Sequence, residues 1–420
     1  MRQQSVQAEI RSILGSVAWH QVFFGNNKTK IEACNANMDE ISYPWDIVVL
    51  ISDDMIPQVE GWDAVIRTHM SAYFPSTDGI LWCNDGCQAE NLNTLCIYGR
   101  KMYESLGHIY RPEYKSLFCD TELTDRCRGD LAPKCQYIPY CIIRHEHPGT
   151  GFAQNMDALY AKNQVYWSTD LHTYIARKTY PFHWSILIPT IRGREHSLQR
   201  LLDSVHEKAQ RIAPELTYEV RLAFDDRETS VGLKRQKLLQ GAKGKYMSFI
   251  DDDDEITDAY IEDLWAMVGG GYDTMRLRGQ MSYYKFVHST EITLSSRAAT
   301  MDDPPVFQRP PNHLNPMLSD IAKLAPFKDA KRGEDLDWTL SLYRTGAVKT
   351  EYRSDPSRTH YIYNVGNRLV DASVLRRQQE MSYEAMLGLV WIPGSQSFQP
   401  APSPDGPRVL RLGTRGFVSK

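Results

Sequence analysis

The feature that most constrains the fold of this chain is an order of elements that occurs twice. Residues 20–54, HQVFFGNNKTKIEACNANMDEISYPWDIVVLISDD, and residues 218–254, YEVRLAFDDRETSVGLKRQKLLQGAKGKYMSFIDDDD, can be compared element by element. Both read as a strand, a polar turn, a helix with an early lysine, a second strand and a group of acids. In each copy a second acidic group follows, and a histidine comes after it at the same spacing. Self-similarity of this length predicts two copies of one domain.

The second copy is predicted to form a layered α/β domain. Its apolar run WSILIPTI (184–191) is followed by a helical pattern over 194–212, a strand over 218–226, a helix over 230–244 and another strand over 245–250. Strands that alternate with helices indicate parallel pairing. Ligands of such sheets bind at the carboxyl ends of the strands, where this chain places its acidic residues. The fold class is therefore α/β, with two tandem Rossmann-like mixed sheets.

The two copies differ at their beginning. The second has a complete opening strand and helix, whereas the first has room for a helix but hardly for a strand as well, so we expect it to lack its opening strand. A Pro-, Gly- and Asn-containing stretch separates the copies, and a Pro- and Gly-rich stretch ends the chain. The predicted organisation is a truncated domain over 1–150, a connector over 151–183, a complete domain over 184–392 and a tail over 393–420.

Four consecutive aspartates, 251–254, follow the third strand of the second copy. Adjacent like charges repel, so a cation is expected beside them. Because residues i and i+2 of a strand share a face, Asp251 and Asp253 should reach one ion. Carboxylate oxygens suit Mg²⁺ or Mn²⁺, and His360 is a candidate nitrogen ligand. The alternative is that the acids only cap the helix that follows them.

A second acidic pair, Glu334 and Asp335, opens the predicted helix RGEDLDWTLSLYRTG (332–346). A helix start keeps a carboxylate ionised, and an ionised carboxylate that faces a ligand can act as a general base. The alternative is an ordinary capped helix. Basic residues that could meet a phosphate follow two of the strands; they are Arg192, Arg194, Lys234 and Arg235.

Together, the motifs SILIPTIRGREHSLQRLLDSV, YEVRLAFDD, SVGLKRQ, AKGKYMSFIDDDDEI, RGEDLDW and THYIY resemble glycosyltransferase family 2, which has the GT-A fold. The resemblance covers 184–363. The first half, about 20–150, resembles a divergent relative of the kind found in phage and bacterial glycosyltransferases, with WDIVVLISDDMIPQVEGWD, LFCDTELTDR and IIRHEHP as its motifs.

The resemblance implies a nucleotide-sugar donor, usually a uridine diphosphate sugar, and inversion at the anomeric carbon. Asp335 would be the catalytic base, with Glu334 beside it, and Mn²⁺ or Mg²⁺ would be bound by Asp251, Asp253 and His360. The donor-binding residues that it implies are Thr190, Arg192, Asp226, Lys234, Asp251 and Asp252.

The first copy carries counterparts of these acids and histidines. If it is active, its site would consist of Asp53, Asp54, Asp120, Glu122, His145 and His147. The first copy is either a second active enzyme or an inactive copy that serves as a scaffold.

The net charge of −4 provides no general basic field for nucleic acid or membranes. No apolar run approaches the length of a membrane span, and no signal peptide is evident, so the expected location is the cytoplasm of a bacterium or of a phage-infected host. All eight cysteines lie between Cys34 and Cys141 and are expected to be free thiols, with a zinc site around Cys83 and Cys87 as the alternative.

The acceptor is expected to be a glycan or, in a phage, a hydroxymethylated DNA base. Two other functional classes stay open, a metal-dependent hydrolase and a non-catalytic tandem sugar-binding protein. The sequence leaves the oligomeric state open.

Overall fold

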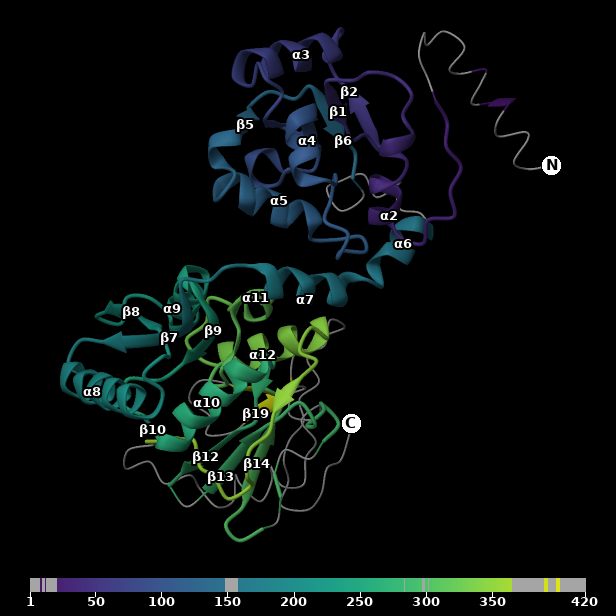
Figure 1. The fold of residues 1–420 in the computed structure, drawn as a ribbon. Helices are drawn as coiled ribbons and strands as arrows, with labels where there is room; N and C mark the ends of the chain where they lie inside the picture. Colours follow the sequence, from purple (N-terminus) through teal and green to yellow (C-terminus); the bar gives the residue numbers. More distant parts are fainter. Residues whose placement is uncertain are drawn as a thin grey trace. The chain divides into compact units, whose positions relative to one another are not determined.

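The computed structural model describes residues 8–9, 12, 21–147, 158–282, 284–296, 299–300, 302–364, 389–391 and 398–400. The chain divides into two compact units, Met1–Lys178 and Thr179–Lys420 (Figure 1). Helices and strands alternate in both units, as the predicted α/β class requires.

The second unit is built around a six-stranded sheet with the order β16-β11-β15-β9-β7-β8. β7 runs parallel to both β8 and β9, which agrees with the parallel pairing predicted from strand–helix alternation. β15 is antiparallel to β9 and β11, so the sheet is mixed. The elements of this layer are β7 (Phe182–Ile191), α8 (Glu195–Ile212), β8 (Tyr218–Asp225), α9 (Val231–Gly241), β9 (Gly244–Phe249), α10 (Asp258–Gly270), β11 (Thr274–Met275), β15 (Met317–Leu318), α11 (Ser319–Ala322), α12 (Glu334–Thr345) and β16 (Glu351–Tyr352).

A second sheet of five strands, with the order β10-β17-β12-β13-β14, belongs to the same unit. Its strands come from stretches in which the sequence had indicated no sheet. They are β10 (Glu255–Ile256), β12 (Leu277–Met281), β13 (Tyr284–His288), β14 (Val306–Arg309) and β17 (Tyr361–Tyr363). A short pair, β18 (Leu389–Trp391) and β19 (Phe398–Pro400), follows, and residues 401–420 of the predicted tail lie outside the described residues.

The core of the second unit forms where β7 and β9 are covered on both faces. Trp184 and Phe249 are completely buried, as are most of their neighbours along these two strands. Ser248 provides the hydrogen-bond acceptor for two large side chains in this core. Its Oγ accepts from Trp184 Nε1 at 2.9 Å and from Tyr260 Oη at 2.8 Å. Near-continuous apolar runs are expected of parallel strands that have no solvent face.

The first unit contains a four-stranded sheet with the order β1-β4-β3-β5 and a separate pair, β2 and β6. Its elements are α2 (Lys30–Asn35), η1 (Met38–Glu40), β1 (Ile47–Val49), β2 (Met55–Pro57), α3 (Trp62–Tyr73), β3 (Ile80–Cys83), η2 (Ala89–Asn91), β4 (Ile97–Gly99), α4 (Arg100–Leu106), α5 (Cys119–Arg128), η3 (Ala132–Lys134), β5 (Cys135–Ile138), β6 (Ile143–His145), α6 (Ala158–Gln164) and α7 (Trp167–Arg177).

This sheet has the same order and strand directions as part of the larger one. β1-β4-β3-β5 corresponds to β9-β15-β11-β16, with antiparallel, antiparallel and parallel pairing in both. The antiparallel pair β2–β6 corresponds likewise to β10–β17. Within the described residues, the first unit has no counterpart of β7 or β8.

The missing neighbours explain one wrong prediction. Residues 21–25, expected to be a strand, have no regular secondary structure. The strand to which they correspond, β8, obtains its ladder bonds from β7, and the described residues of the first unit include no strand in that position. A strand without a neighbour cannot pair its backbone groups, so the segment is irregular.

The predicted connector over 151–183 is largely part of the first unit. Asp170 on α7 is completely buried, and its carboxylate accepts from the backbone N–H groups of Lys115, Ser116 and Leu117 at 2.7–2.9 Å. The division between the units accordingly falls after Lys178. None of the helices in the described part of the chain combines the length and apolar character that a membrane-spanning helix needs.

Candidate active site

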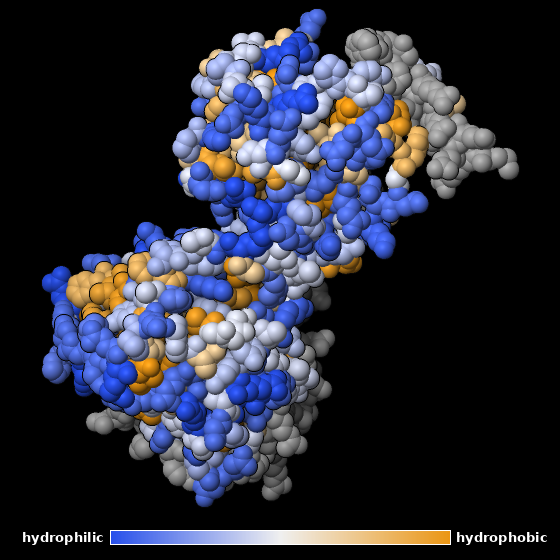
Figure 2. Space-filling model, viewed as in Figure 1, coloured by the Kyte–Doolittle hydropathy of each residue, from blue (hydrophilic) through white to orange (hydrophobic). Residues whose placement is uncertain are grey.

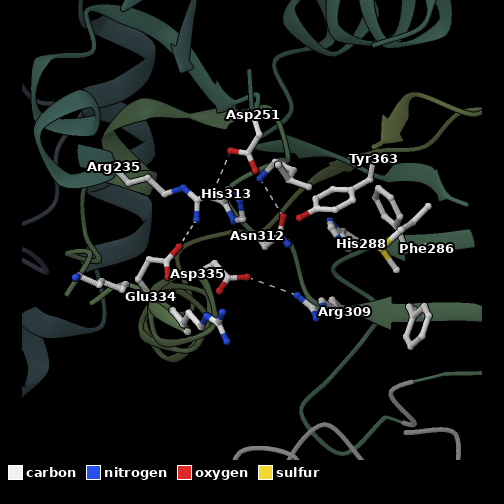
Figure 3. Close-up of a pocket in the computed structure, with 16 residues that line it drawn as sticks. Arg235, Asp251, Phe286, His288, Arg309, Asn312, His313, Glu334, Asp335 and Tyr363 are labelled. Atoms are coloured by element: carbon white, nitrogen blue, oxygen red, sulfur yellow. Dashed lines mark hydrogen bonds and ion pairs between the residues drawn. The ribbon is translucent and has the colours of Figure 1, made fainter. Parts of the chain in front are cut away.

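A cavity of about 550 Å³ lies in the second unit, where residues that follow β9 meet the first turn of α12 and the strands β12, β13 and β14 (Figure 3). It contains two of the acidic groups singled out in the sequence. The lining residues are Arg235, Asp251, Met281, Phe286, His288, Phe307, Arg309, Asn312, His313, Leu314, Lys331, Arg332, Gly333, Glu334, Asp335 and Tyr363.

The four aspartates after β9 lie in a turn rather than in the strand, because β9 ends at Phe249. Asp254 N–H donates to Asp251 O at 3.1 Å, which closes this turn. The expectation that Asp251 and Asp253 share a strand face is therefore wrong. Their carboxylates contact different cations, Asp251 with Arg235 at 3.1 Å and Asp253 with Arg194 at 3.0 Å.

Asp252 and Asp254 are buried, and Asp252 shares Arg194 with Asp253. Asp252 accepts from Thr190 Oγ1 and from Arg194 Nη1, both at 2.6 Å. Asp254 accepts from Tyr361 Oη and from Asn364 N–H, both at 2.8 Å. Two guanidinium groups and a set of neutral donors thus offset the repulsion within the cluster.

Arg235 is the central cation of the cavity. Its side chain is buried and donates to Asp251 and to Glu334 (Figure 3). The guanidinium group also lies over the ring of Phe249, at 5.8 Å from the centroid. Burial lowers the pKa of Arg235, but the carboxylates of Asp251 and Glu334 outweigh burial and raise that pKa above its usual value. Arg235 therefore stays charged and ties α9 to both acidic groups.

The first turn of α12 presents its acids in two different environments. The helix starts after Gly333, whose φ of +77° lies in the left-handed region that glycine adopts readily. Glu334 is buried against Arg235, and burial raises the pKa of its carboxyl group. Asp335 is partly exposed to the cavity, and its carboxylate lies 3.7 Å from Arg309 Nη1. Of the two, Asp335 is the carboxylate that a ligand can reach.

The residues predicted to bind the nucleoside lie at the ends of β7 and β8. Arg192 and Asp226 are exposed and 3.6 Å apart. Lys234 is buried; its Nζ donates to Thr190 O at 2.8 Å and contacts Asp225, which lowers the pKa of the Asp225 carboxyl group. Lys234 therefore joins two strand ends, and Arg192 with Asp226 is the pair left accessible here.

His360 is not a metal ligand in this structure, so that prediction is wrong. Its ring is completely buried, its Nδ1 accepts from Arg278 N–H at 2.9 Å, and its Nε2 lies 2.7 Å from Asp263. Both nitrogens are occupied by protein partners that join β12 and α10 to the chain before β17. His360 contacts the carboxylate of Asp263 rather than an aspartate of the cluster at 251–254.

The oxygen donors of Asp251 and Asp253 are of the type that Mg²⁺ and Mn²⁺ prefer. These ions are often held by one or two carboxylates, with phosphate oxygens completing the shell. The donor set thus fits such an ion in chemistry, but only as a partial site. Among the described residues, no group of three or more His, Cys, Asp or Glu side chains is arranged to hold a metal ion.

Sequence reasoning missed the side of the cavity formed by β13, β14 and the following loop. Arg309, Asn312 and His313 come from this region, which has no acidic motif and no strong periodicity. Burial holds the pKa of His313 well below its usual range, and Nδ1 of this ring has no hydrogen-bond partner in the described structure. Burial likewise lowers the pKa of His288 to about 3, so both imidazoles are neutral at pH 7.

In the first unit, three of the predicted residues lie together. Asp54 lies 3.2 Å from His145 Nε2 and accepts from Tyr160 Oη, and the ring of His147 lies 5.3 Å from that of His145. Asp53 is exposed.

The other two predicted residues of the first unit lie on α5. Glu122 is taken up by ion pairs with Arg177 at 2.9 Å and Arg111 at 3.0 Å, whereas Asp120 accepts from Thr121 N–H. Glu122 therefore serves the packing of α5 against α7. All eight cysteines are free thiols, including Cys83 and Cys87.

Comparison with known proteins gives weak similarities only. No family model matches the chain, and neither does any curated protein. Among solved structures, TarS 1–349 of S. aureus is 16% identical over 43% of this chain, with a TM-score of 0.31, and the chain spans 60% of it. TarS 1–349 in complex with UDP-GlcNAc is 14% identical over 48% of this chain, with a TM-score of 0.30 and 68% of that chain covered. Similarities of this size carry no conclusion about activity.

The buried aspartate of the cluster predicts a pH dependence of stability. Burial, and then the charge of Asp251, raise the pKa of Asp254 to about 8. Because the folded state holds this proton more tightly than the unfolded state, the contribution is present at acidic pH and is lost as the pH rises through 8. The free energy of unfolding of Asp254→Asn is therefore expected to decrease less than that of the wild type as the pH rises from about 5 to about 8. One such group changes the free energy of unfolding by at most about 1.4 kcal/mol per pH unit.

The measurement is denaturant unfolding of both proteins across this pH range without divalent ions. Asp355→Asn is the control, because Asp355 is exposed and bonds only within its own turn. Parallel stability curves for the wild type and Asp254→Asn would contradict the prediction.

Proposed function

We propose that this protein is a glycosyltransferase that moves a sugar from a nucleotide-diphosphate sugar, with a uridine diphosphate sugar as the first candidate, to a hydroxyl group of an acceptor, with inversion at the anomeric carbon. The observation that carries the proposal is one cavity with two acidic walls. Asp251 of the cluster after β9 and Asp335 of α12 line it together, and a buried arginine lies between the two acidic groups.

A transfer reaction needs a cation near the leaving diphosphate and a carboxylate base near the acceptor hydroxyl, and the region of the cavity contains both kinds of group. Arg194, which pairs with Asp252 and Asp253 outside the lining of the cavity, would offer a cation to a diphosphate, and its side chain is 43% exposed. Asp335 offers an accessible carboxylate at a helix start, where the dipole favours its ionised form. The donor's sugar would occupy the space between them.

In the proposed reaction, Asp335 accepts the proton of the acceptor hydroxyl as that oxygen forms a bond to the anomeric carbon. The bond from this carbon to the diphosphate oxygen breaks, and the diphosphate leaves with the electron pair. Arg194 would stabilise the charge of the leaving group. Glu334 fixes Arg235 and thereby the shape of the cavity wall.

A divalent ion is part of the proposal. Asp251 and Asp253 would hold Mn²⁺ or Mg²⁺, which would neutralise the diphosphate when bound. Their present pairing with arginines means that an incoming ion and the donor would compete with these guanidinium groups. For the acceptor, a glycan and, in a phage, a hydroxymethylated DNA base are the candidates.

The test is a thermal-shift screen of nucleotide sugars with Mn²⁺, with Mg²⁺ and with a chelator, because a ligand that binds the folded state raises the melting temperature. UDP-sugars with metal are expected to stabilise the protein, and incubation with an acceptor is expected to release the nucleoside diphosphate. If no nucleotide sugar shifts the melting temperature, the proposal fails. Release of free sugar with every acceptor tested would indicate a hydrolase instead.

A further inference from the structure

The strand β8 forms one edge of the six-stranded sheet and carries an apolar stripe. Val220, Leu222 and Phe224 alternate along it, and these residues are 37%, 46% and 51% exposed. In Figure 2 an apolar patch is visible over β8, at the edge of the second unit. Scattered exposed apolar residues need no explanation, but three in alternation on one face of an edge strand form a continuous surface.

The backbone of this strand has one unpaired side. Thr217 O accepts from the N–H of Trp184, and Asp225 O accepts from the N–H of Arg192, so the odd-numbered residues direct their backbone groups toward β7. The N–H and C=O groups of the even-numbered residues 218–224 therefore point away from the sheet. In the ranges that the structure describes, no other strand pairs with this side.

The edge has little of the usual protection against pairing. Natural edge strands are commonly blocked by proline, a bulge, a short length or charged residues. β8, with the sequence YEVRLAFD, is eight residues long and has no proline or lysine; Glu219, one of its charged residues, accepts from Ser185 Oγ at 2.7 Å and from Lys243 N–H at 2.7 Å. Its charged side chains, Glu219 and Arg221, lie on the opposite face from the apolar stripe, because successive side chains of a strand alternate.

We propose that β8 pairs antiparallel with β8 of a second copy of this chain, about a twofold axis that passes through Val220. This register places Glu219 directly opposite Arg221 of the other copy, twice per interface. Moving the axis to Glu219 or to Arg221 places like charges opposite each other, and moving it to Leu222 places Glu219 opposite Asp225. Like charges directly opposite destabilise a sheet, which disfavours these three registers. An axis through Ala223 would place Arg221 opposite Asp225, but the Asp225 carboxylate already contacts Lys234 and accepts from Thr229 N–H in its own chain.

This pairing would join the two apolar stripes into one. Val220 would meet its own counterpart, and Leu222 would meet Tyr218 of the other copy on the same face. Tyr218 accepts or donates a hydrogen bond with His206 of α8 at 2.8 Å, which places α8 beside the stripe on this face. The interface is isologous, as expected for a twofold dimer, and the two sheets would become one of twelve strands (six from each copy).

The test is the oligomeric state of the full chain, measured by sedimentation between about 1 µM and about 100 µM, a range in which mass action reveals weak dimers. The wild type is expected to dimerise within it. Leu222→Pro should weaken the dimer at least about tenfold while keeping the fold, because proline removes only an N–H that points away from β7. Leu222→Lys should also weaken the dimer, because it places a charge within the apolar stripe. Val165→Lys, at an apolar residue that is 71% exposed in the other unit, is its control and should leave the dimer intact.

The register has its own test. Glu219→Lys alone should weaken the dimer, and Glu219→Lys combined with Arg221→Glu should restore it. A wild type that stays monomeric over this range, or a folded Leu222→Pro variant that dimerises as well as the wild type, would overturn the proposal. Monomeric protein with slow hydrogen exchange at Val220 and Leu222 would show that another segment of the chain covers the edge.

Discussion

Replacing Asp335 by Asn is expected to lower kcat by roughly 10²–10⁴, the usual contribution of a general base. The amide keeps the size and the helix start of Asp335 but cannot accept the proton of the acceptor hydroxyl. Since the carboxylate is partly exposed and has only a distant contact with Arg309, the fold should hardly change. The measurement is sugar transfer under single-turnover conditions, with donor binding and melting temperature determined in parallel.

The matched control is Asp337→Asn in the same turn of α12. Asp337 pairs with Lys328 at 3.0 Å and does not line the cavity, so its loss should change the rate by less than about threefold. If Asp335→Asn retains wild-type kcat while donor binding is intact, Asp335 is not the base. If both variants lose activity equally, the effect belongs to the helix start and not to one carboxylate.

Replacing Arg235 by Met is expected to cost about 3–5 kcal/mol of stability, because it leaves Glu334 and Asp251 without their common cation. Glu334 is 4% exposed and Arg235 is 5% exposed, so solvent screens this network little. The measurement is denaturant unfolding at pH 7, with the free energy of unfolding compared between the variant and the wild type.

Two further variants make this result interpretable. Arg211→Met removes an exposed arginine that bridges Glu207 and Asp258, and it should leave the unfolding midpoint nearly unchanged. Adding Glu334→Met to Arg235→Met should recover part of the loss, since the buried charge is then removed together with its partner. An Arg235→Met variant as stable as the wild type would show that the network contributes nothing to folding.

The arrangement around Arg194 and Arg235 bears on how a donor would bind. Each arginine pairs with a carboxylate that is a candidate metal ligand. Arg194 is the more accessible of the two, whereas Arg235 is held by Glu334 from the other side. We therefore expect Arg194 to change partners when a diphosphate enters and Arg235 to keep its place.

The order of strands and helices at the start of the second unit, from β7 to β9, could be read from the sequence alone. Apolar runs such as WSILIPTI and the helical spacing of Leu198, Leu201 and Val205 are local patterns, and local patterns set local structure. The position of the acids at strand ends follows from the same patterns. The tandem repeat was predicted from these patterns too, and the two sheets share one order of four strands.

The partners of the site residues were decided by the tertiary structure. His360 contacts Asp263, Glu122 contacts Arg177, and Arg235 contacts Glu334, each across a long stretch of chain. A motif records which groups follow one another, but a buried charge pairs with whichever group the packing brings within reach. For that reason the acidic cluster, the helix start and Arg235 could be predicted as residues. The position of Arg235 between the two acidic groups, and the β13–β14 wall of the cavity, were decided only by the folded chain.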